Sequence, residues 1–178
     1  MKLIIVGYMA SGKTTFGKAL SEKLGTPFID LDEYIETSMS KTIPQIFNEL
    51  GEEEFRKIEK ESLRKVIEEN PDIVLACGGG TPCFYDNMDY LNKNGVTVFL
   101  ETSIPVLISR LQGENSGRPL VAGKTHEEIR QQVLTQLCER LPKYIEAKLK
   151  WSGDDLETIE QIDRNTDTFI SSYPSLFR

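Results

Sequence analysis

The chain has 178 residues and a formal net charge of −7 at pH 7, with 39% hydrophobic and 28% charged residues. We expect one domain over residues 1–178, because a chain of this length buries roughly 70% of its unfolded surface and needs no disulfide or metal. The acidic balance excludes a protein whose main role is to coat nucleic acid or anionic membranes. The apolar runs are far shorter than the roughly 20 residues of a membrane span, and the N-terminal residues do not form a signal peptide.

The cysteine and histidine content argues against disulfides and zinc. Cys77, Cys83 and Cys138 are odd in number and form no C-x-x-C pair, so we expect a reducing, cytoplasmic setting. His126 is the only histidine, which excludes a multi-histidine metal site. The sequence Thr-His-Glu-Glu around it is typical of a capping box that opens a helix.

Short apolar blocks alternate with helical patterns along the chain. Strands are expected at 2–6, 27–29, 72–77, 96–100 and 148–151. Helices are expected before Gly25, from 43 onward with a break at Gly51, and at 84–94, 104–111, 126–147 with a bend or break at Pro142, and 153–172. This alternation predicts an α/β sandwich around a parallel sheet, with the fifth strand at an edge.

Residues 7–14, Gly-Tyr-Met-Ala-Ser-Gly-Lys-Thr, match the pattern G-x-x-x-x-G-K-[ST] between the first strand and a helix. In such a loop, which we call the phosphate loop, backbone N–H groups and the helix N-terminus face a polyphosphate. Lys13 can reach the β- and γ-phosphates, and the Thr14 hydroxyl can ligate Mg²⁺. A glycine-rich turn that merely starts a helix is the alternative, and the context favours a nucleoside triphosphate site. The residues expected to contact it are Ala10, Ser11, Gly12, Lys13, Thr14 and Thr15.

Asp30 and Asp32 follow the second predicted strand. Alternate residues of an extended segment share a face, so both carboxylates can point into one cleft. One could hold magnesium through water, while the other accepts a proton from an attacking hydroxyl. An isolated D-x-D is more often a pair of turn residues that cap the next helix, but the phosphate loop upstream favours the site.

Several arginines are candidates for binding anionic groups. Arg56 and Glu59 are three apart on a helix and therefore neighbours. Taken alone, they are best interpreted as an exposed ion pair worth at most about 1 kcal/mol. The functional alternative is a glutamate that orients an arginine toward a carboxylate. Arg110 and Arg140 are further candidates, and Arg118 is either a solvated loop charge or an arginine on a lid that closes over phosphates.

The three glycines at 78–80 end the third strand. They lie at the carboxyl edge of the sheet, where α/β folds place their ligands. Because they carry no side chains, their backbone N–H groups stay approachable. We therefore expect this segment to contact a substrate.

With these motifs in order, the chain from Gly7 to about Ala147 resembles the shikimate kinase family. The resemblance is carried by the phosphate loop, F-I-D-L-D at 28–32, G-E-E-E-F-R-K-I-E at 51–59, the triple glycine, R-P-L at 118–120 and R-L-P-K-Y at 140–144. It implies a three-layer P-loop kinase sandwich like that of nucleoside monophosphate kinases, with a mostly parallel five-stranded sheet. It also implies an acid-binding helical segment at about 32–61 and a lid at about 112–124.

The resemblance implies transfer of the γ-phosphoryl group of ATP to the 3-hydroxyl of shikimate, a step toward chorismate and the aromatic amino acids. Shikimate would be held by Asp32, Arg56, Gly78, Gly79, Gly80 and Arg140, with Glu59 as the partner of Arg56. Asp32 would orient and deprotonate the hydroxyl. The substrates would be ATP and shikimate, with a monomer as the expected state and no nucleic-acid or membrane partner.

The same resemblance implies the roles of the nucleotide-binding residues. Arg118 would lie on the ATP phosphates as the lid arginine, and Arg110 would lie against adenine. Lys13 and Mg²⁺ would neutralise developing charge, with the metal held by Thr14 and indirectly by Asp30. The catalytic residues would thus be Lys13, Asp32 and Arg118.

Two positions depart from the family pattern. Ala10 stands where glycine is usual, which a backbone with negative φ would tolerate, and Ala76-Cys77 precedes the triple glycine where a small hydroxyl residue is common. Beyond Ala147 the match fades, so the adenine loop after the last strand is not determined.

Two other functions are alternatives to this one. Another small-metabolite kinase, such as a gluconate kinase or a nucleoside monophosphate kinase, would share the architecture, but the D-G-[FY]-P-R stretch of an adenylate kinase is absent and the arginine pair favours a carboxylic acid. A GTPase-type switch needs an N-K-x-D guanine reader, and N-K-N-G at 92–95 lacks the aspartate.

Overall fold

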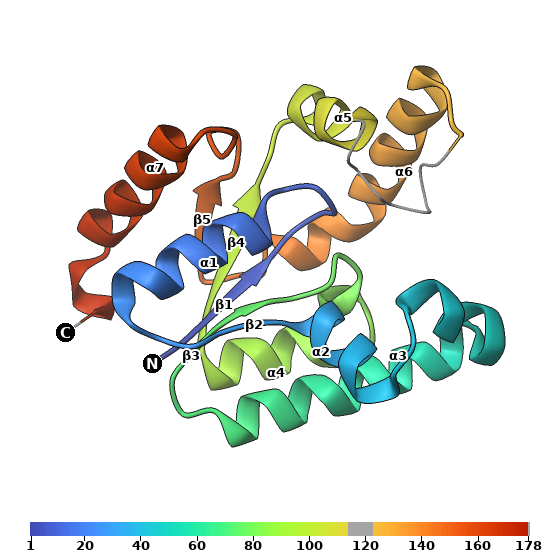
Figure 1. Cartoon of the computed structure of the whole chain (residues 1–178), viewed down its shortest axis with the longest axis horizontal. Helices are drawn as coiled ribbons and strands as arrows, with labels where there is room; N and C mark the ends of the chain where they lie inside the picture. Colours follow the sequence, from blue (N-terminus) through green and yellow to red (C-terminus); the bar gives the residue numbers. More distant parts are fainter. Residues whose placement is uncertain (114–122, 178) are drawn as a thin grey trace.

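A five-stranded parallel sheet forms the centre of the computed structural model, which describes residues 1–113 and 123–177 (Figure 1). The strands are β1 (Lys2–Val6), β2 (Phe28–Asp30), β3 (Ile73–Ala76), β4 (Val96–Glu101) and β5 (Leu149–Ser152). Their order is β2-β3-β1-β4-β5, and each neighbouring pair is parallel. The predicted α/β sandwich and the edge position of the fifth strand are therefore confirmed.

Helices cover both faces of this sheet, as Figure 1 shows. They are α1 (Lys13–Leu24), α2 (Leu31–Met39), α3 (Ile43–Glu69), α4 (Asn87–Asn94), α5 (Ile104–Gln112), α6 (His126–Tyr144) and α7 (Ile159–Ser172), with short 3-10 turns η1 (Thr81–Cys83) and η2 (Pro174–Leu176). α1 and α7 pack on one face, whereas α3, α4 and α6 pack on the other. Within the described ranges, no helix is both long enough and apolar enough to span a bilayer.

The first strand explains why the sheet is buried on both faces. Leu3 and Ile5 pack with Phe16 of α1, whereas Ile4 and Val6 point to the opposite face, and all of them are fully buried. Burial of each such side chain contributes roughly 1.5–3 kcal/mol relative to leaving it exposed. A continuous apolar block without polar alternation is what a central parallel strand requires.

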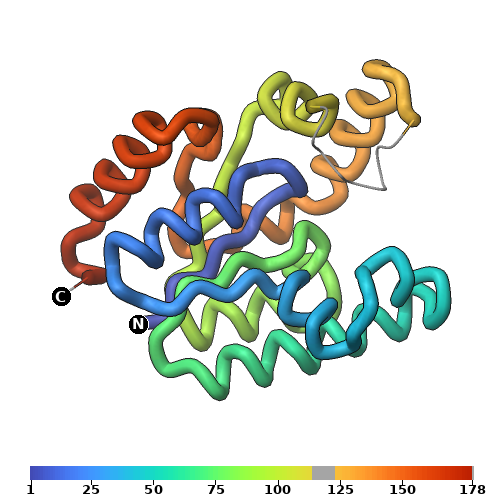
Figure 2. The backbone as a smooth tube through the Cα atoms, viewed as in Figure 1, coloured from blue at the N-terminus to red at the C-terminus, as the bar shows by residue number. Residues whose placement is uncertain are grey.

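The carboxyl ends of the strands all lie at one edge of the sheet. Figure 2 shows both chain termini on the same side of the molecule, away from the start of α3 and from the start of α6. Because β1 begins near the N-terminus and all strands run parallel, their carboxyl ends face the opposite side. The turns after β1, β2 and β3 therefore meet at this edge.

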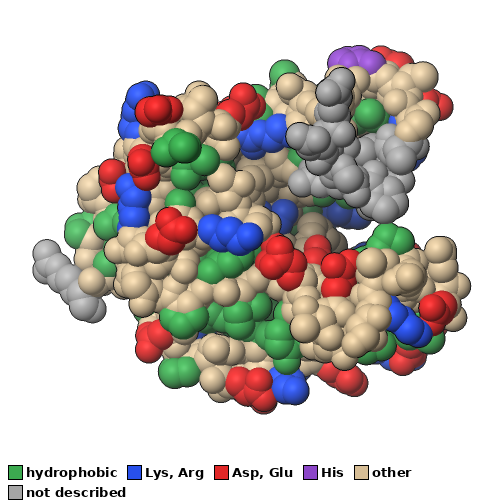
Figure 3. All heavy atoms as spheres, viewed as in Figure 1, with side chains coloured by type: hydrophobic (Ala, Val, Ile, Leu, Met, Phe, Trp, Pro, Cys, Tyr) green, Lys and Arg blue, Asp and Glu red, His purple; other side chains and the backbone are tan. Residues whose placement is uncertain are grey.

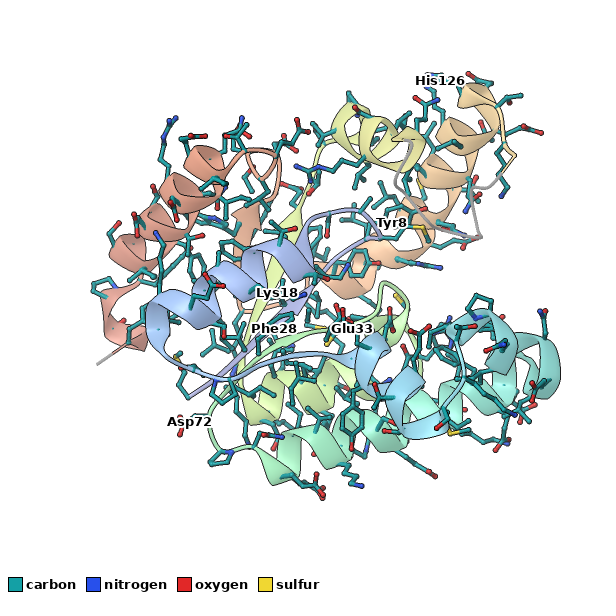
Figure 4. All side chains as sticks on the ribbon, in the orientation of Figure 1. Tyr8, Lys18, Phe28, Glu33, Asp72 and His126 are labelled. Atoms are coloured by element: carbon teal, nitrogen blue, oxygen red, sulfur yellow. The ribbon has the colours of Figure 1, made fainter. Side chains whose placement is uncertain are left out.

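Three predicted helix boundaries can be checked directly. Gly51 interrupts α3 with φ 79° and ψ 170°, which confirms the break, and Thr125 caps α6 through a capping box. His126 lies at the outer end of α6 (Figure 4), as the cap interpretation requires. Of the bend or break predicted at Pro142, the break is wrong, because α6 continues to Tyr144. Pro142 removes only one hydrogen bond near the last turn, and the next turn is closed from Ile145 N to the Leu141 carbonyl at 3.0 Å.

Two other helices start later than predicted. α7 begins at Ile159 and not at 153, since Thr158 caps it through a capping box and residues 153–158 form a loop. The backbone N–H of Gly153 donates to the Glu101 carbonyl at 2.7 Å, which extends the sheet edge into this loop. The helix expected at 84–94 begins at Asn87, after η1.

Candidate active site

A cavity of about 540 Å³ opens at the carboxyl edge of the sheet. In the space-filling view of Figure 3, acidic and basic side chains gather around a hollow between the α5–α6 region and the α2–α3 region. The predicted site residues that line the cavity are Ala10, Gly12, Lys13, Thr14, Thr15, Asp30, Asp32, Gly79 and Arg110. The structure thus brings the phosphate loop and the D-x-D pair into one cavity.

The phosphate loop connects β1 to α1. Gly12 precedes α1 with φ 96° and has no side chain to cap the helix, so the first N–H groups of α1 stay available for an anion. The Lys13 ammonium donates to the Tyr8 carbonyl at 2.8 Å, which holds this side chain back over the loop. Within the loop, Ser11 is buried, and its carbonyl accepts from the Thr102 hydroxyl at 3.0 Å. The loop is therefore fixed from below and open toward the cavity.

Ala10 occupies a left-handed conformation with φ 63°. The negative φ that would make alanine an easy replacement for glycine is therefore not what this chain adopts. A non-glycine residue pays roughly 1–2 kcal/mol for this conformation. The loop carries that strain at a position where its carbonyl accepts from Arg110 at 3.3 Å.

Asp30 links the phosphate loop to α2. One carboxylate oxygen accepts from the Thr14 hydroxyl at 2.7 Å, and the other accepts from the Asp32 backbone N–H at 3.0 Å and caps α2. The prediction that Asp30 and Asp32 share a face of an extended segment is wrong, because Asp32 already lies in the first turn of α2. The helix turn nevertheless directs both carboxylates into the cavity.

Asp32 is the acid most perturbed by its surroundings. Its pKa is raised from 3.8 to about 6, mainly by burial and to a smaller extent by the neighbouring carboxylates of Asp30 and Glu59, against the opposing effect of Lys13. A carboxylate with a pKa near 6 is ionised at neutral pH and is a better proton acceptor than an ordinary aspartate. Its position and chemistry suit a general base.

Arg56 and Glu59 form a buried pair. Their exposed fractions are 9% and 1%, and Arg56 Nη1 donates to Glu59 Oε2 at 2.9 Å. The guanidinium also donates to Glu52 at 3.2 Å and lies 3.8 Å from the ring centroid of Phe84. The interpretation as an exposed ion pair is therefore wrong. Phe84 and η1 cover this face of α3, which the sequence spacing alone did not indicate.

Two of the three glycines make room for charged side chains. A Cβ atom on Gly78 would lie 2.6 Å from Asp32 Oδ1, and one on Gly80 would lie 2.8 Å from Arg56 Nη1. Real Cβ atoms do not approach polar side-chain atoms so closely. The absence of side chains at 78 and 80 therefore allows Asp32 from α2 and Arg56 from α3 to converge at the end of β3.

Arg140 of α6 reaches the middle glycine, Gly79. A Cβ atom on Gly79 would lie 3.6 Å from Arg140 Nη1, and the hydroxyl of Tyr144 donates to the Gly79 carbonyl. Tyr8 of the phosphate loop, labelled in Figure 4, donates from its hydroxyl to Gln136 Oε1 at 2.7 Å. Its ring centroid lies 5.8 Å from the Arg140 guanidinium. Burial raises the pKa of Tyr8 to about 12, so this hydroxyl stays protonated and continues to donate.

Arg110 joins the phosphate loop to the loop after β5. Its two terminal nitrogens donate to the carbonyls of Gly153 and Asp154, each at 2.9 Å, and Nη1 also lies 3.3 Å from the carbonyls of Ala10 and Ser11. Burial lowers the pKa of Arg110, but the guanidinium stays charged at neutral pH. Arg110 thereby shapes the end of the cavity where the phosphate loop meets the loop after β5.

Leu156 and Glu157 line the cavity, although the sequence did not indicate them. A Cβ atom on Gly12 would lie 2.7 Å from a terminal carbon of Leu156, and Glu157 lies 3.7 Å from Arg110 Nε. The available signal was one apolar residue within the acidic stretch D-D-L-E after the last strand. Arg118 and most of the predicted lid at 112–124 lie outside the described residues.

Known proteins of one family are similar in sequence to this chain. The family model described as shikimate kinase matches residues 9–170. The shikimate kinase of Bacteroides fragilis is 44% identical over 163 residues, which cover 92% of this chain and 90% of that protein.

Two solved structures extend the likeness to the fold. A shikimate kinase from Bacteroides thetaiotaomicron has a TM-score of 0.94 at 40% identity, covering 98% of both chains. A shikimate kinase from Acinetobacter baumannii, solved in complex with shikimate, has a TM-score of 0.83 at 31% identity, covering 98% of this chain and 93% of that one. These findings confirm the resemblance and decide against the rival kinases and the GTPase-type switch. The chain belongs to the shikimate kinase family.

Proposed function

We propose that this enzyme transfers the γ-phosphoryl group of ATP to the 3-hydroxyl of shikimate, with the residue roles given below. The observation that carries these roles is the convergence of Asp32, Arg56 and Arg140 on the triple glycine, next to the phosphate loop. Two arginines suit a carboxylate, and a partly buried aspartate suits a hydroxyl. The site thus combines recognition of a hydroxy acid with a place for a triphosphate.

The triphosphate lies along the phosphate loop. The N–H groups at the start of α1 donate to its oxygens, and Lys13 moves from the Tyr8 carbonyl to the β- and γ-phosphates. The adenine lies between Arg110 and Leu156, which meet at the same end of the cavity. Arg110 is already held by four carbonyl groups, so it presents a preformed face to the base.

The acid lies at the other end, against the triple glycine. Arg56 and Arg140 grip its carboxylate, since each guanidinium offers paired donors. Glu59 keeps the Arg56 guanidinium in place. The backbone of Gly79 is held by Tyr144, which fixes the floor of this subsite.

Asp32 orients the 3-hydroxyl of shikimate and accepts its proton as the oxygen attacks the γ-phosphorus. Its raised pKa favours this transfer. Lys13 stabilises the charge that develops on the transferred group, which is the dominant contribution in phosphoryl transfer. Arg118 adds a further positive charge over the phosphates by the family resemblance.

Oxygen atoms suitable for Mg²⁺ lie side by side at the start of α1. The Thr14 hydroxyl and the Asp30 carboxylate are joined at 2.7 Å inside the cavity. Mg²⁺ prefers oxygen ligands and is usually held by one or two protein groups together with phosphate oxygens. Thr14 and, through water, Asp30 would hold the ion, which supplies positive charge to the β- and γ-phosphates.

The proposal extends to the state of the protein. Every residue assigned above belongs to one chain, so a monomer is sufficient, and size-exclusion chromatography at assay concentration tests this. Cys77, Cys83 and Cys138 are free thiols, in agreement with the reducing, cytoplasmic setting expected from their spacing.

Calorimetric titration of each substrate separately tests the assignment of the acid subsite. Arg140→Lys should weaken shikimate binding by roughly 2–4 kcal/mol, because lysine cannot reproduce the paired donors, while ATP affinity stays nearly unchanged. The matched control is Arg130→Lys on the same helix, an exposed arginine paired with Glu127, which should change neither affinity. Equal losses for both substrates, or no loss for either, would remove Arg140 from the acid subsite.

A further inference from the structure

Thr81, the residue after the triple glycine, is fully buried and contacts Glu59. Its hydroxyl donates to Glu59 Oε1 at 2.5 Å. The proposed roles above do not use this residue. A buried hydroxyl that donates to a carboxylate forms a charge-assisted hydrogen bond, which is stronger than one between neutral groups.

The two oxygens of Glu59 have different partners. Oε2 accepts from Arg56 and Oε1 accepts from Thr81. With an exposed fraction of 1%, Glu59 cannot replace either partner with bulk water. An unsatisfied buried acceptor is costly, so loss of the Thr81 hydroxyl would shift the position of the Glu59 carboxylate. Such a shift reaches Arg56 directly, because Arg56 donates to the same carboxylate.

Thr81 is itself held firmly. Its backbone N–H donates to the Gly78 carbonyl at 3.1 Å, and its carbonyl accepts from Asn87 Nδ2 at 2.9 Å. Asn87 is fully buried, and its side-chain oxygen accepts from Arg64 at 3.2 Å. Thr81 therefore connects Glu59 to η1 and α4 through backbone contacts that no side-chain substitution at 81 removes.

The Thr81 hydroxyl and the carboxylates of Glu59 and Asp32 converge beside Gly78. A Cβ on Gly78 would lie 3.0 Å from the Thr81 hydroxyl, 3.2 Å from Glu59 Oε1 and 2.6 Å from Asp32 Oδ1. A displacement of the Glu59 carboxylate would consequently be transmitted both to Arg56 and to the space beside Asp32.

We infer that Thr81 is a positioning residue for the acid substrate. Its hydroxyl fixes the Glu59 carboxylate, and Glu59 in turn fixes the Arg56 guanidinium at the triple glycine. The inference rests on the proposed role of Arg56 in binding the carboxylate of shikimate.

Steady-state kinetics of Thr81→Val tests this inference. Valine has nearly the same shape but no donor, so KM for shikimate should rise roughly tenfold while KM for ATP changes less than about twofold. Thr81→Ser keeps the hydroxyl and should restore KM for shikimate. If Thr81→Val does not fold, Thr81→Cys with its weak donor is measured instead, and an intermediate KM is expected.

A double-mutant cycle with Glu59→Gln separates positioning from a general packing effect. If Thr81 acts through Glu59, adding Thr81→Val to Glu59→Gln should change KM for shikimate less than about twofold. The matched control is Thr166→Val, a fully buried threonine in α7 whose hydroxyl donates to the Ile162 carbonyl at 2.6 Å. It should leave both KM values unchanged.

Arg56→Lys serves as the reference variant. If it raises KM for shikimate and Thr81→Val does not, the role of Thr81 is overturned while the acid subsite stands. If neither variant raises it, the proposed role of Arg56 fails as well. Additive effects of Thr81→Val and Glu59→Gln, or an equal rise in KM for ATP, would also overturn the inference.

Discussion

Gly80 and Arg56 approach so closely that a Cβ atom on Gly80 would lie 2.8 Å from Nη1 and 2.9 Å from Nη2 of Arg56. The guanidinium of Arg56 cannot move away easily, because it donates a hydrogen bond to Glu59 and the ring of Phe84 packs against its face. A glycine at this position therefore allows the Arg56 guanidinium to lie against the triple glycine.

Gly80→Ala should weaken shikimate binding and leave ATP binding intact. The added methyl group displaces the Arg56 guanidinium from its place beside the triple glycine, while the phosphate loop is untouched. We expect KM for shikimate to rise about tenfold or more, in line with loss of a desolvated charged contact, with KM for ATP nearly constant. An unchanged KM for shikimate in a folded variant would contradict this account of the glycine.

Lys13→Ala should abolish catalysis without unfolding the protein. Lys13 lies at the start of α1 and is only partly buried, so removal of its side chain leaves the core intact. Loss of its charge from the phosphates should lower kcat by roughly a thousandfold or more. The matched control is Lys18→Ala on the same helix, an exposed lysine labelled in Figure 4. Near-normal turnover of folded Lys13→Ala would be incompatible with the proposed phosphate site.

Asp32 should make the folded protein less stable as the pH rises. Its pKa is raised from 3.8 to about 6 on folding, so its contribution to stability is present below pH 4 and lost as the pH rises through 6. The loss amounts to about 2–3 kcal/mol. The measurement is the free energy of unfolding in urea, with EDTA present, for the wild type and Asp32→Asn at pH 4.5 and 7.5. The stability of Asp32→Asn relative to the wild type should be higher at pH 7.5 than at pH 4.5 by about this amount. A difference between the two proteins that does not change with pH would refute the shifted pKa.

Ala10→Gly should be tolerated in the phosphate loop. Glycine removes a conformational cost of roughly 1–2 kcal/mol at φ 63°. Its greater freedom in the unfolded chain lowers the stability of the folded state by roughly 0.5–1 kcal/mol, which offsets part of this gain. We expect unchanged kinetics and a free energy of unfolding that rises by up to about 1.5 kcal/mol. Ala19→Gly inside α1 is the control and should lose about 1 kcal/mol. A clear loss of stability in Ala10→Gly would mean that the alanine methyl group matters more than its strain.

The sequence was most informative where the signal is local. The apolar block at 2–6 and the phosphate loop that follows it predicted β1 and the start of α1, because strand burial and loop chemistry depend on neighbouring residues. The break at Gly51 and the cap at Thr125 are local signals of the same kind.

What the sequence left open depends on contacts between distant segments. The Arg56–Glu59 pair is buried because η1 and Phe84 cover α3, and spacing along one helix cannot show what packs upon it. Leu156 joins the cavity through its contact with Gly12, far away in the chain. Asp32 was placed in the right cavity for the wrong reason, since a helix turn and not an extended segment directs it there.

The most direct test of the account is a coupled ADP-release assay with shikimate, gluconate and AMP as separate acceptors, followed by phosphorus NMR of the product. With shikimate, one ADP should be released for each shikimate consumed, and the product should be shikimate 3-phosphate. With gluconate or AMP, no more ADP should be released than in the reaction without acceptor. Faster ADP release with gluconate or AMP, or none above background with shikimate, would contradict the account.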